Sequence, residues 1–361
     1  MLTLTECNSF SSISHEHEFC RDSFAIDVHA NRYVIISGGY RKETILKSSL
    51  IYDTITGVKI HLPLPPVNNH IPICNGAVID KYFYILDYSK AVHRILIEPP
   101  FSHQRWEVVG ECQIRNNIWS IASDGKLIYI IDEDNNLVSF NPVTTTYTDL
   151  PTMPTKRHSY TTTLLDKKLY VIGGFRASSY LFSVDIFNIE TRKWSKGADI
   201  PLLENNKSTM SLSMERIGGL VFANAVVVGK CILISGGIIN SFRSSESFLV
   251  YNTLRQKWSI SKVKFQTPCH SHKCVNIGNS RILIFGGKNM DGDALPFSVG
   301  SIDVTAFNIG NWYEIGHFIL LRRLFEENRV KMCNDENFPS LTEHLMTISI
   351  DIFRHILLFL L

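Results

Sequence analysis

Basic and polar side chains that could hold an anion recur at two kinds of position in the sequence. One position follows directly after a pair of adjacent glycines, and the other lies just before the hydrophobic run that begins a new unit. Arginine can form two parallel charge-assisted hydrogen bonds to a carboxylate or phosphate group, and serine adds a further donor. Solvated surface loops would have a similar composition, but we favour a binding surface for an acidic or phosphorylated peptide. The residues that we predict to contact it are Arg41, Lys42, Arg115, Arg157, His158, Arg176, Ser178, Arg243 and Lys288.

A second cluster contains residue types that ligate zinc, because residues 269–274 read Cys-His-Ser-His-Lys-Cys. On an extended strand alternate side chains share a face, which would place His270, His272 and Cys274 on one side. The cluster occupies the same position in its unit as residues 157–159, so we interpret it as structural and predict no metal ion.

Motifs of the common enzyme classes are missing from the sequence. It contains no Walker loop, no Gly-x-Ser-x-Gly elbow, no His-Glu-x-x-His and no dinucleotide-binding fingerprint. Asp132 and Asp134 lie in an Asp-Asn context that is typical of turns. We therefore predict no catalytic residue and no cofactor.

The elements that must position the basic side chains follow from a repeated pattern. In residues 166–194 a β-rich run ends in Gly173-Gly174, Phe187 follows thirteen residues after the second glycine, and Trp194 lies seven residues further on. Adjacent glycines after a strand favour a turn with positive φ or a backbone with no room for a Cβ atom. An aromatic residue and a tryptophan on neighbouring strands can anchor adjacent layers of a sheet.

The same pattern recurs along the chain. Further glycine pairs occur at residues 38–39, 236–237 and 286–287, with Tyr52, Tyr251 and Phe307 as the aromatic partners and Trp258 and Trp312 as the tryptophans. Two copies, at residues 67–110 and 111–155, have lost the glycine pair and have a shorter loop after the second strand. Six copies of a four-strand unit predict a closed ring, because each small sheet buries its faces against two neighbours.

These hallmarks resemble the kelch-repeat family, in which a hydrophobic run before Gly-Gly is followed by an aromatic-Asn/Asp pair and then Trp. The resemblance covers residues 20–319 and implies an all-β, six-bladed kelch-type β-propeller with about four antiparallel strands per blade. We expect an N-terminal segment at residues 1–20, the propeller at residues 21–319 and a short helical C-terminal tail at residues 320–361. Two alternatives close the ring: residues 2–11 add a strand to the last blade, or residues 312–318 complete it.

Kelch propellers serve mainly as interaction platforms, so the resemblance implies a non-catalytic protein-interaction module. The insertion at residues 204–219 would emerge on the same rim and either cover the central cavity, contact a partner or have no role. The tail at residues 341–361 is similar to the first helix of an F-box, which suggests a ubiquitin-ligase substrate adaptor with ligase components as partners. The alternative is an enzyme similar to kelch-like sugar isomerases, with Arg157, His158 and His270 as polarising or acid–base groups.

Composition and charge exclude several other classes. Hydrophobic residues make up 45% and charged residues 19% of the chain, which is typical of a globular protein. The net charge of +2 is too small to suggest nucleic acid as a partner. The longest apolar stretch, residues 220–239, contains Lys230 and a glycine pair and aligns with the repeat, so we predict a strand pair rather than a membrane span.

Eight scattered cysteines form no Cys-x-x-Cys pair, and the first residues show no secretory signal. Both features favour a reducing compartment. We predict the cytoplasm, with the nucleus as the alternative.

Overall fold

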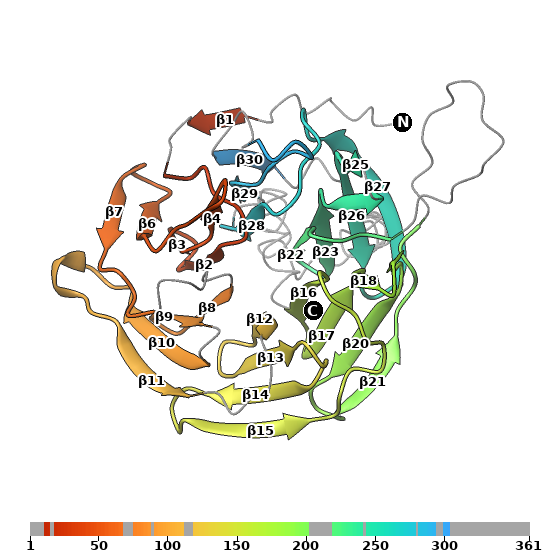
Figure 1. Ribbon diagram of the computed structural model, residues 1–361, viewed down its shortest axis with the longest axis horizontal. Coiled ribbons are helices and arrows are strands. Elements are labelled where there is room, and N and C mark those ends of the chain that lie inside the picture. The colour runs from red at the N-terminus through yellow and green to blue at the C-terminus, as the bar shows by residue number, and fades with distance from the viewer. Residues whose placement is uncertain are drawn as a thin grey trace, which may run out of the picture. The chain divides into compact units, whose positions relative to one another are not determined.

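The computed structural model describes residues 11–14, 18–67, 75–87, 90–111, 118–201, 219–240, 243–278, 281–293 and 299–303. All of these belong to one compact unit, residues 1–309, in which six four-stranded antiparallel sheets surround a central axis (Figure 1). The predicted all-β, six-bladed propeller is therefore confirmed. The predicted helical tail, residues 320–361, lies outside the described residues.

Each sheet forms one blade, and its first strand lies innermost. Blade 1 contains β2 (Ala25–His29), β3 (Tyr33–Ser37), β6 (Ser49–Asp53) and β7 (Lys59–Leu62). Blade 2 contains β8 (Asn75–Ile79), β9 (Tyr82–Leu86), β10 (Ala91–Leu96) and β11 (Glu107–Glu111), with a short 3₁₀ helix, η1 (Phe101–His103), before its last strand. Blade 3 contains β12 (Ile118–Ser123), β13 (Ile128–Asp132), β14 (Leu137–Asn141) and β15 (Thr146–Leu150).

The other three blades follow the same plan. Blade 4 contains β16 (Thr161–Leu165), β17 (Lys168–Ile172), β20 (Val184–Asn188) and β21 (Lys193–Lys196). Blade 5 contains β22 (Asn224–Val228), β23 (Cys231–Ser235), β26 (Ser247–Asn252) and β27 (Lys257–Lys264). Blade 6 contains β28 (Lys273–Asn276), β29 (Arg281–Phe285), β30 (Val299–Asp303) and, from the other end of the chain, β1 (Ser11–Ser14).

The burial of each strand explains its composition. The second strand of a blade is buried along most or all of its length, as in β23 with its sequence CILIS, because neighbouring blades cover both of its faces. The outermost strand has only one covered face, so exposed and half-buried residues alternate along much of β27. The repeated hydrophobic runs of the sequence are these second strands.

One hydrophobic cluster fills each of the six junctions between neighbouring blades. At the junction of blades 3 and 4, Phe187 lies beside Trp194 with ring centroids 5.1 Å apart. The indole nitrogen of Trp194 donates a hydrogen bond to the carbonyl oxygen of Pro151 in the preceding blade, at 2.7 Å. Trp106 and Trp258 make equivalent bonds to Pro63 and Ala198, each at 2.8 Å. The aromatic residues and tryptophans therefore stabilise the junctions, as predicted.

The first described strand closes the ring. The innermost strands are neighbours in the cyclic order β2, β8, β12, β16, β22, β28 and back to β2. Strand β1 pairs antiparallel with β30 and completes blade 6. A strand of the N-terminal segment therefore completes blade 6, as in the first predicted alternative, but it lies at Ser11–Ser14; residues 2–10 and 312–318 lie outside the described residues.

The predicted third strand of blade 6 needs a correction. We expected it around Phe307, but the strand that pairs with β29 is β30. Ile302 lies opposite Ile282, the position that Phe187 takes opposite Leu169 in blade 4. Ile302 follows Gly287 by fifteen residues and Phe307 follows it by twenty, so the spacing itself favours Ile302. The strand was missed because it has an aliphatic residue where the other blades with a glycine pair have an aromatic one.

Candidate functional site: a rim of three hairpins

The glycine pairs join each blade to the segment that leads into the next one. We call residues 21–24, 157–160, 220–223 and 269–272 the lead-in segments of blades 1, 4, 5 and 6. Gly173 and Gly174 both have positive φ, and a Cβ atom on Gly173 would lie 2.3 Å from the carbonyl oxygen of Leu220 in the lead-in of blade 5. The amide of Gly174 donates to that same oxygen at 2.8 Å. The glycine pair is therefore a junction between blades, and no side chain of any size fits there.

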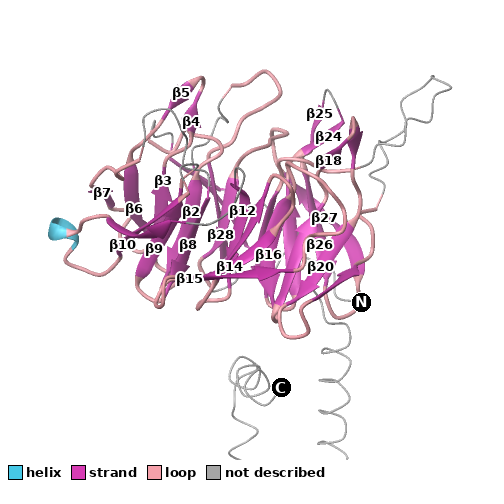
Figure 2. Ribbon diagram, turned by 60° about the horizontal axis from the view of Figure 1, so that its bottom comes forward, coloured by secondary structure: helices cyan, strands magenta, loops and turns pink. Residues whose placement is uncertain are grey.

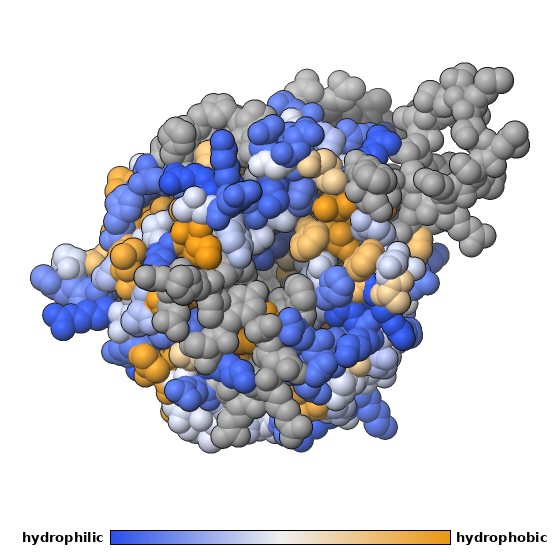
Figure 3. All heavy atoms as spheres, in the orientation of Figure 1, coloured by the Kyte–Doolittle hydropathy of each residue, from blue (hydrophilic) through white to orange (hydrophobic). Residues whose placement is uncertain are grey.

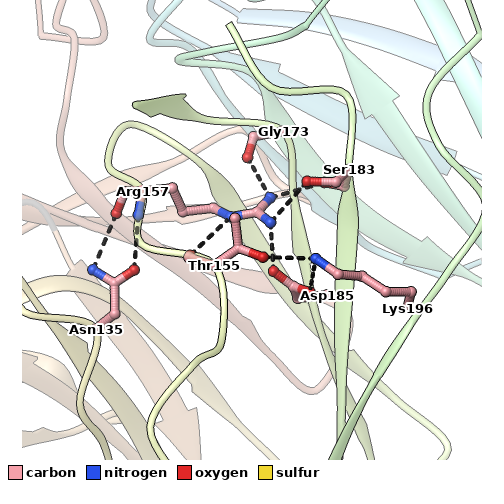
Figure 4. A network of polar contacts seen from close by, with 7 residues as sticks. All are labelled: Asn135, Thr155, Arg157, Gly173, Ser183, Asp185 and Lys196. Atoms are coloured by element: carbon pink, nitrogen blue, oxygen red, sulfur yellow. Dashed lines mark hydrogen bonds and ion pairs between the residues drawn. The ribbon is translucent and has the colours of Figure 1, made fainter. Parts of the chain in front are cut away.

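Arg157 belongs to this junction rather than to the surface. Its guanidinium group donates to the carbonyl oxygens of Gly173 at 2.7 Å and Ser183 at 2.8 Å, and pairs with the carboxylate of Asp185 (Figure 4). Lys196 contacts the other carboxylate oxygen at 2.6 Å. The side chains of Arg157 and Asp185 have no exposed surface. The predicted partner-binding role of Arg157 is wrong, because its donors are already used inside blade 4.

Arg21 repeats this arrangement in blade 1 and was missed by the sequence analysis. It donates to the carbonyl oxygens of Gly38 at 2.9 Å and Ser48 at 3.2 Å, and burial lowers its pKa to about 10. The sequence does contain a motif that marks this arginine, because residues 21–24 and 157–160 both read Arg-x-Ser followed by an aromatic residue. Aligning the lead-in segments with one another would have identified both arginines as structural.

In blades 2 and 3 aspartate turns replace the glycine pair. The carboxylate of Asp132 accepts hydrogen bonds from the backbone and side-chain nitrogens of Asn136, at 2.9 and 3.0 Å. Asp87 likewise accepts from the amide of Ala91 at 3.0 Å. The interpretation of Asp132 as a turn residue is confirmed. Among the described residues, hydrogen bonds of the two aspartates close both connections, and neither contains a described hairpin.

Asn135, which the sequence analysis also missed, takes over the joining role of the glycines in blade 3. Its side-chain oxygen accepts from the amide of Arg157 at 2.9 Å. Its side-chain nitrogen donates to the carbonyl oxygen of the same residue at 3.3 Å. The amide group therefore stabilises the junction of blades 3 and 4 where no glycine pair is present.

Three of the four blades with a glycine pair carry a small hairpin instead of a tight turn. The hairpins are β4 (Tyr40–Arg41) with β5 (Thr44–Ile45), β18 (Phe175–Arg176) with β19 (Ser179–Tyr180), and β24 (Ile238–Asn240) with β25 (Arg243–Ser244). All three project from the same face of the ring (Figure 2). The predicted contact residues among their exposed side chains are Arg41, Lys42, Arg176, Ser178 and Arg243, which together we call the hairpin rim.

The remaining predicted contact residues have different surroundings. Lys288 is half-buried and lies 3.2 Å from the carboxylate of Asp22, so its charge is partly neutralised. His158 is exposed, and its ring packs against Phe175 at the foot of the blade 4 hairpin, with centroids 5.4 Å apart. Arg115 lies outside the described residues. The structure thus brings five of the nine predicted residues to the hairpins and places His158 beside them.

The cluster at residues 269–274 differs from the predicted extended strand. Ser271 has φ of 57°, which turns the backbone, and β28 begins only at Lys273. His270 is hydrogen-bonded to the hydroxyl group of Ser244 at 3.0 Å, and His272 to that of Ser235 at 2.7 Å. The two histidines therefore face different partners, and the described residues contain no group of three ligands that could hold a metal ion.

Burial keeps the two histidines and the Cys274 thiol of this cluster uncharged. Desolvation lowers the pKa of His272 to about 3 and raises that of Cys274 to about 12. It also lowers the pKa of His270 to about 4, with a further contribution from the charge of Lys288. At neutral pH these groups are structural hydrogen-bonding partners.

Two further findings bear on the class of protein. Among the described residues, no helix is long and apolar enough to span a bilayer. A family model for the kelch motif matches residues 156–201, which include the lead-in segment, the four strands and the hairpin of blade 4.

Proposed function

Because the chain belongs to the kelch-repeat β-propellers, we propose that its hairpin rim binds an acidic or phosphorylated segment of a partner protein. The kelch motif and the closed ring of blades support a protein-interaction module. One observation carries the finer proposal: blades 1, 4 and 5 each present an exposed arginine on a hairpin of the same face. The buried arginines Arg21 and Arg157 bond to the carbonyl groups that flank the hairpins of blades 1 and 4.

The distribution of charge suggests where the segment binds. Arg176 and Arg243 lie on the neighbouring blades 4 and 5, where each hairpin can offer a planar guanidinium group to a carboxylate or phosphate. Blade 6 has a turn with exposed Asp291 and Asp293, which would repel an anion. The main contact is therefore expected over blades 4 and 5, and Arg41 and Lys42 of blade 1 would meet a more distant part of the partner.

A comparison of two triple variants tests this proposal. Short synthetic peptides rich in glutamate or phosphoserine, and matched peptides with glutamine and serine, serve as probes. The variant R41A/R176A/R243A should bind the acidic peptides about tenfold more weakly, since exposed ion pairs contribute about 0.2–1 kcal/mol each. Added salt should weaken the binding of the wild-type protein as well.

The control variant K126A/K193A/R255A removes the same charge from two turns and the start of β21, at the opposite ends of the strands. It should bind the acidic peptides as the wild-type protein does. Equal weakening in both variants would mean that only the net charge matters, and no weakening in either would overturn the proposal.

The two other predicted functions, a sugar isomerase and a ubiquitin-ligase adaptor, depend on different parts of the chain. An isomerase would need Arg157 at a substrate, but this side chain is enclosed together with Asp185. The arrangement thus favours binding over chemistry at this position. The ubiquitin-ligase link rests on residues 341–361, which lie outside the described residues. We propose it as a second function of the same chain, to be tested by binding of a purified ligase subunit to the full chain and to a chain without this segment.

A further inference from the structure

Phe222 combines two features that are rare in one residue. Its backbone has φ of 53°, in the left-handed region, and 43% of its surface is exposed. A bulky side chain seldom adopts this conformation, because its Cβ atom crowds the following carbonyl oxygen. Strained residues of this kind cluster at binding sites and catalytic centres, so the observed outlier is a reason to look for a role.

The strained backbone at Phe222 is required by the ring, but its aromatic side chain is not. Ser23, Ser159 and Ser271 occupy the same place in the lead-in segments of blades 1, 4 and 6, with φ of 51°, 56° and 57°. Three blades therefore achieve this backbone conformation with a serine, and blade 5 alone of these four has an aromatic residue.

Backbone hydrogen bonds link these four positions from blade to blade. The amide of Phe222 donates to the carbonyl oxygen of Ser159 at 3.0 Å, and the amide of Ser271 donates to that of Phe222 at 2.9 Å. The amide of Ser23 in turn donates to the carbonyl oxygen of Ser271 at 3.2 Å. None of these bonds involves the Phe222 side chain, so the ring does not need the aromatic group for them.

The surroundings of Phe222 connect it to the hairpin rim. The preceding residue, Val221, pairs with Ile238 at the foot of the blade 5 hairpin, which carries Arg243. On the other side, Ser159 follows His158, which pairs with Phe175 next to Arg176. The backbone of Phe222 is therefore linked to the feet of the two hairpins whose arginines we expect to contact the partner, and its ring lies 6.4 Å from that of His270 in the blade 6 lead-in.

The surface over blades 4 and 5 combines hydrophobic and hydrophilic residues. On the face of the hairpins, hydrophobic residues interrupt an otherwise hydrophilic surface in this region (Figure 3). An exposed aromatic group with cations on both sides is complementary to a segment that places an apolar residue between acidic ones.

We propose that Phe222 is the apolar anchor of the rim and packs against an aliphatic or aromatic residue of the partner segment. The acidic residues on either side of that residue meet Arg176 and Arg243. This inference rests on the proposed function and adds to it the central residue of the bound segment. An aromatic anchor at the centre of an interface commonly contributes more to affinity than the charges around it.

A peptide array with the full chain tests the anchor. Each peptide has one central position, occupied by Leu, Phe, Ala or Ser, with either Glu or Gln on both sides. The wild-type protein should prefer Leu or Phe over Ala at the centre by roughly tenfold, and Glu over Gln beside it.

The variant Phe222→Ser introduces the residue that three other blades have in the same backbone conformation. It should keep the melting temperature of the wild-type protein or raise it slightly, because the strain is smaller. It should lose the preference for Leu or Phe while keeping the preference for Glu. The control Leu254→Ser removes another exposed apolar side chain, from the turn between β26 and β27, and should change neither preference.

The outcomes separate the two proposals. A preference for Leu or Phe that persists in Phe222→Ser would overturn the anchor, and so would the absence of that preference in the wild-type protein. If the central preference depends on Phe222 but Glu is not preferred over Gln, the acidic-ligand proposal fails and the anchor remains.

Discussion

Arg157 and Arg176 show how burial decides the role of an arginine. Both lie in blade 4, and both were predicted to contact a partner from their place in the repeat. Arg157 is enclosed with Asp185 and bonded to two carbonyl oxygens, whereas Arg176 is exposed on β18. The first stabilises the junction that presents the second.

We expect Arg157→Ala to lower the free energy of unfolding by about 3–5 kcal/mol, because the variant leaves a buried carboxylate with one partner fewer. Arg176→Ala should change it by less than about 0.5 kcal/mol, as is usual for an exposed side chain. Urea-induced unfolding of both variants measures the difference. Similar values for the two would contradict the assigned roles.

At the scale of elements, the junction between a glycine pair and the next lead-in segment is repeated around the ring. A Cβ atom at Gly173, Gly236 or Gly286 would lie 2.0–2.5 Å from a backbone carbonyl oxygen of the following blade. Blade 3 makes the equivalent contact with the side chain of Asn135. The junction between blades 3 and 4 is therefore kept by a side-chain amide, where the glycine-pair blades use their backbone.

A matched pair of glycines separates the two physical reasons for this residue type. Gly173 and Gly125 have φ of 68° and 83°, but only Gly173 is crowded, since nothing lies within 4 Å of a Cβ atom at Gly125. Gly125→Ala should cost about 1 kcal/mol for the backbone conformation alone.

Gly173→Ala should cost more than about 3 kcal/mol, because the blade 5 lead-in must also move. Chemical denaturation again provides the measurement. Equal costs would mean that positive φ, and not the contact between blades, explains the glycine pair.

At the scale of the whole ring, closure depends on a strand from the start of the chain. Strand β1 covers the outer edge of β30, so its hydrogen bonds join residues that are far apart in sequence. Without β1, blade 6 would end in an unpaired edge that can associate with another chain.

Deletion of residues 1–14 should therefore lower the melting temperature by roughly 10 °C, if the lost strand contributes a few kcal/mol. Deletion of residues 1–10, which leaves β1 in place, is the matched control and should have a much smaller effect. Differential scanning calorimetry measures both. A ring that melts at the same temperature without residues 11–14 would show that β1 does not stabilise the closure.

The amino-acid sequence by itself determined the repeated architecture. Hydrophobic runs, glycine pairs and aromatic residues at constant spacing are local features, so they can be recognised in one repeat and counted along the chain. They identified six blades, and they assigned Gly173, Phe187 and Trp194 to the scaffold. The method failed for the third strand of blade 6, because Ile302 is aliphatic where the other blades with a glycine pair have an aromatic residue.

Only the tertiary structure decided which side chains a partner can reach. Arg157 and Arg176 have the same chemistry and similar places beside the glycine pair. Their exposure differs because the strands and loops packed around Arg157 supply carbonyl oxygens and a carboxylate that no spacing rule reveals. The tertiary structure also identified Phe222 as a candidate anchor. Its strained backbone and its links to the feet of two hairpins are visible only once the blades are packed in a ring.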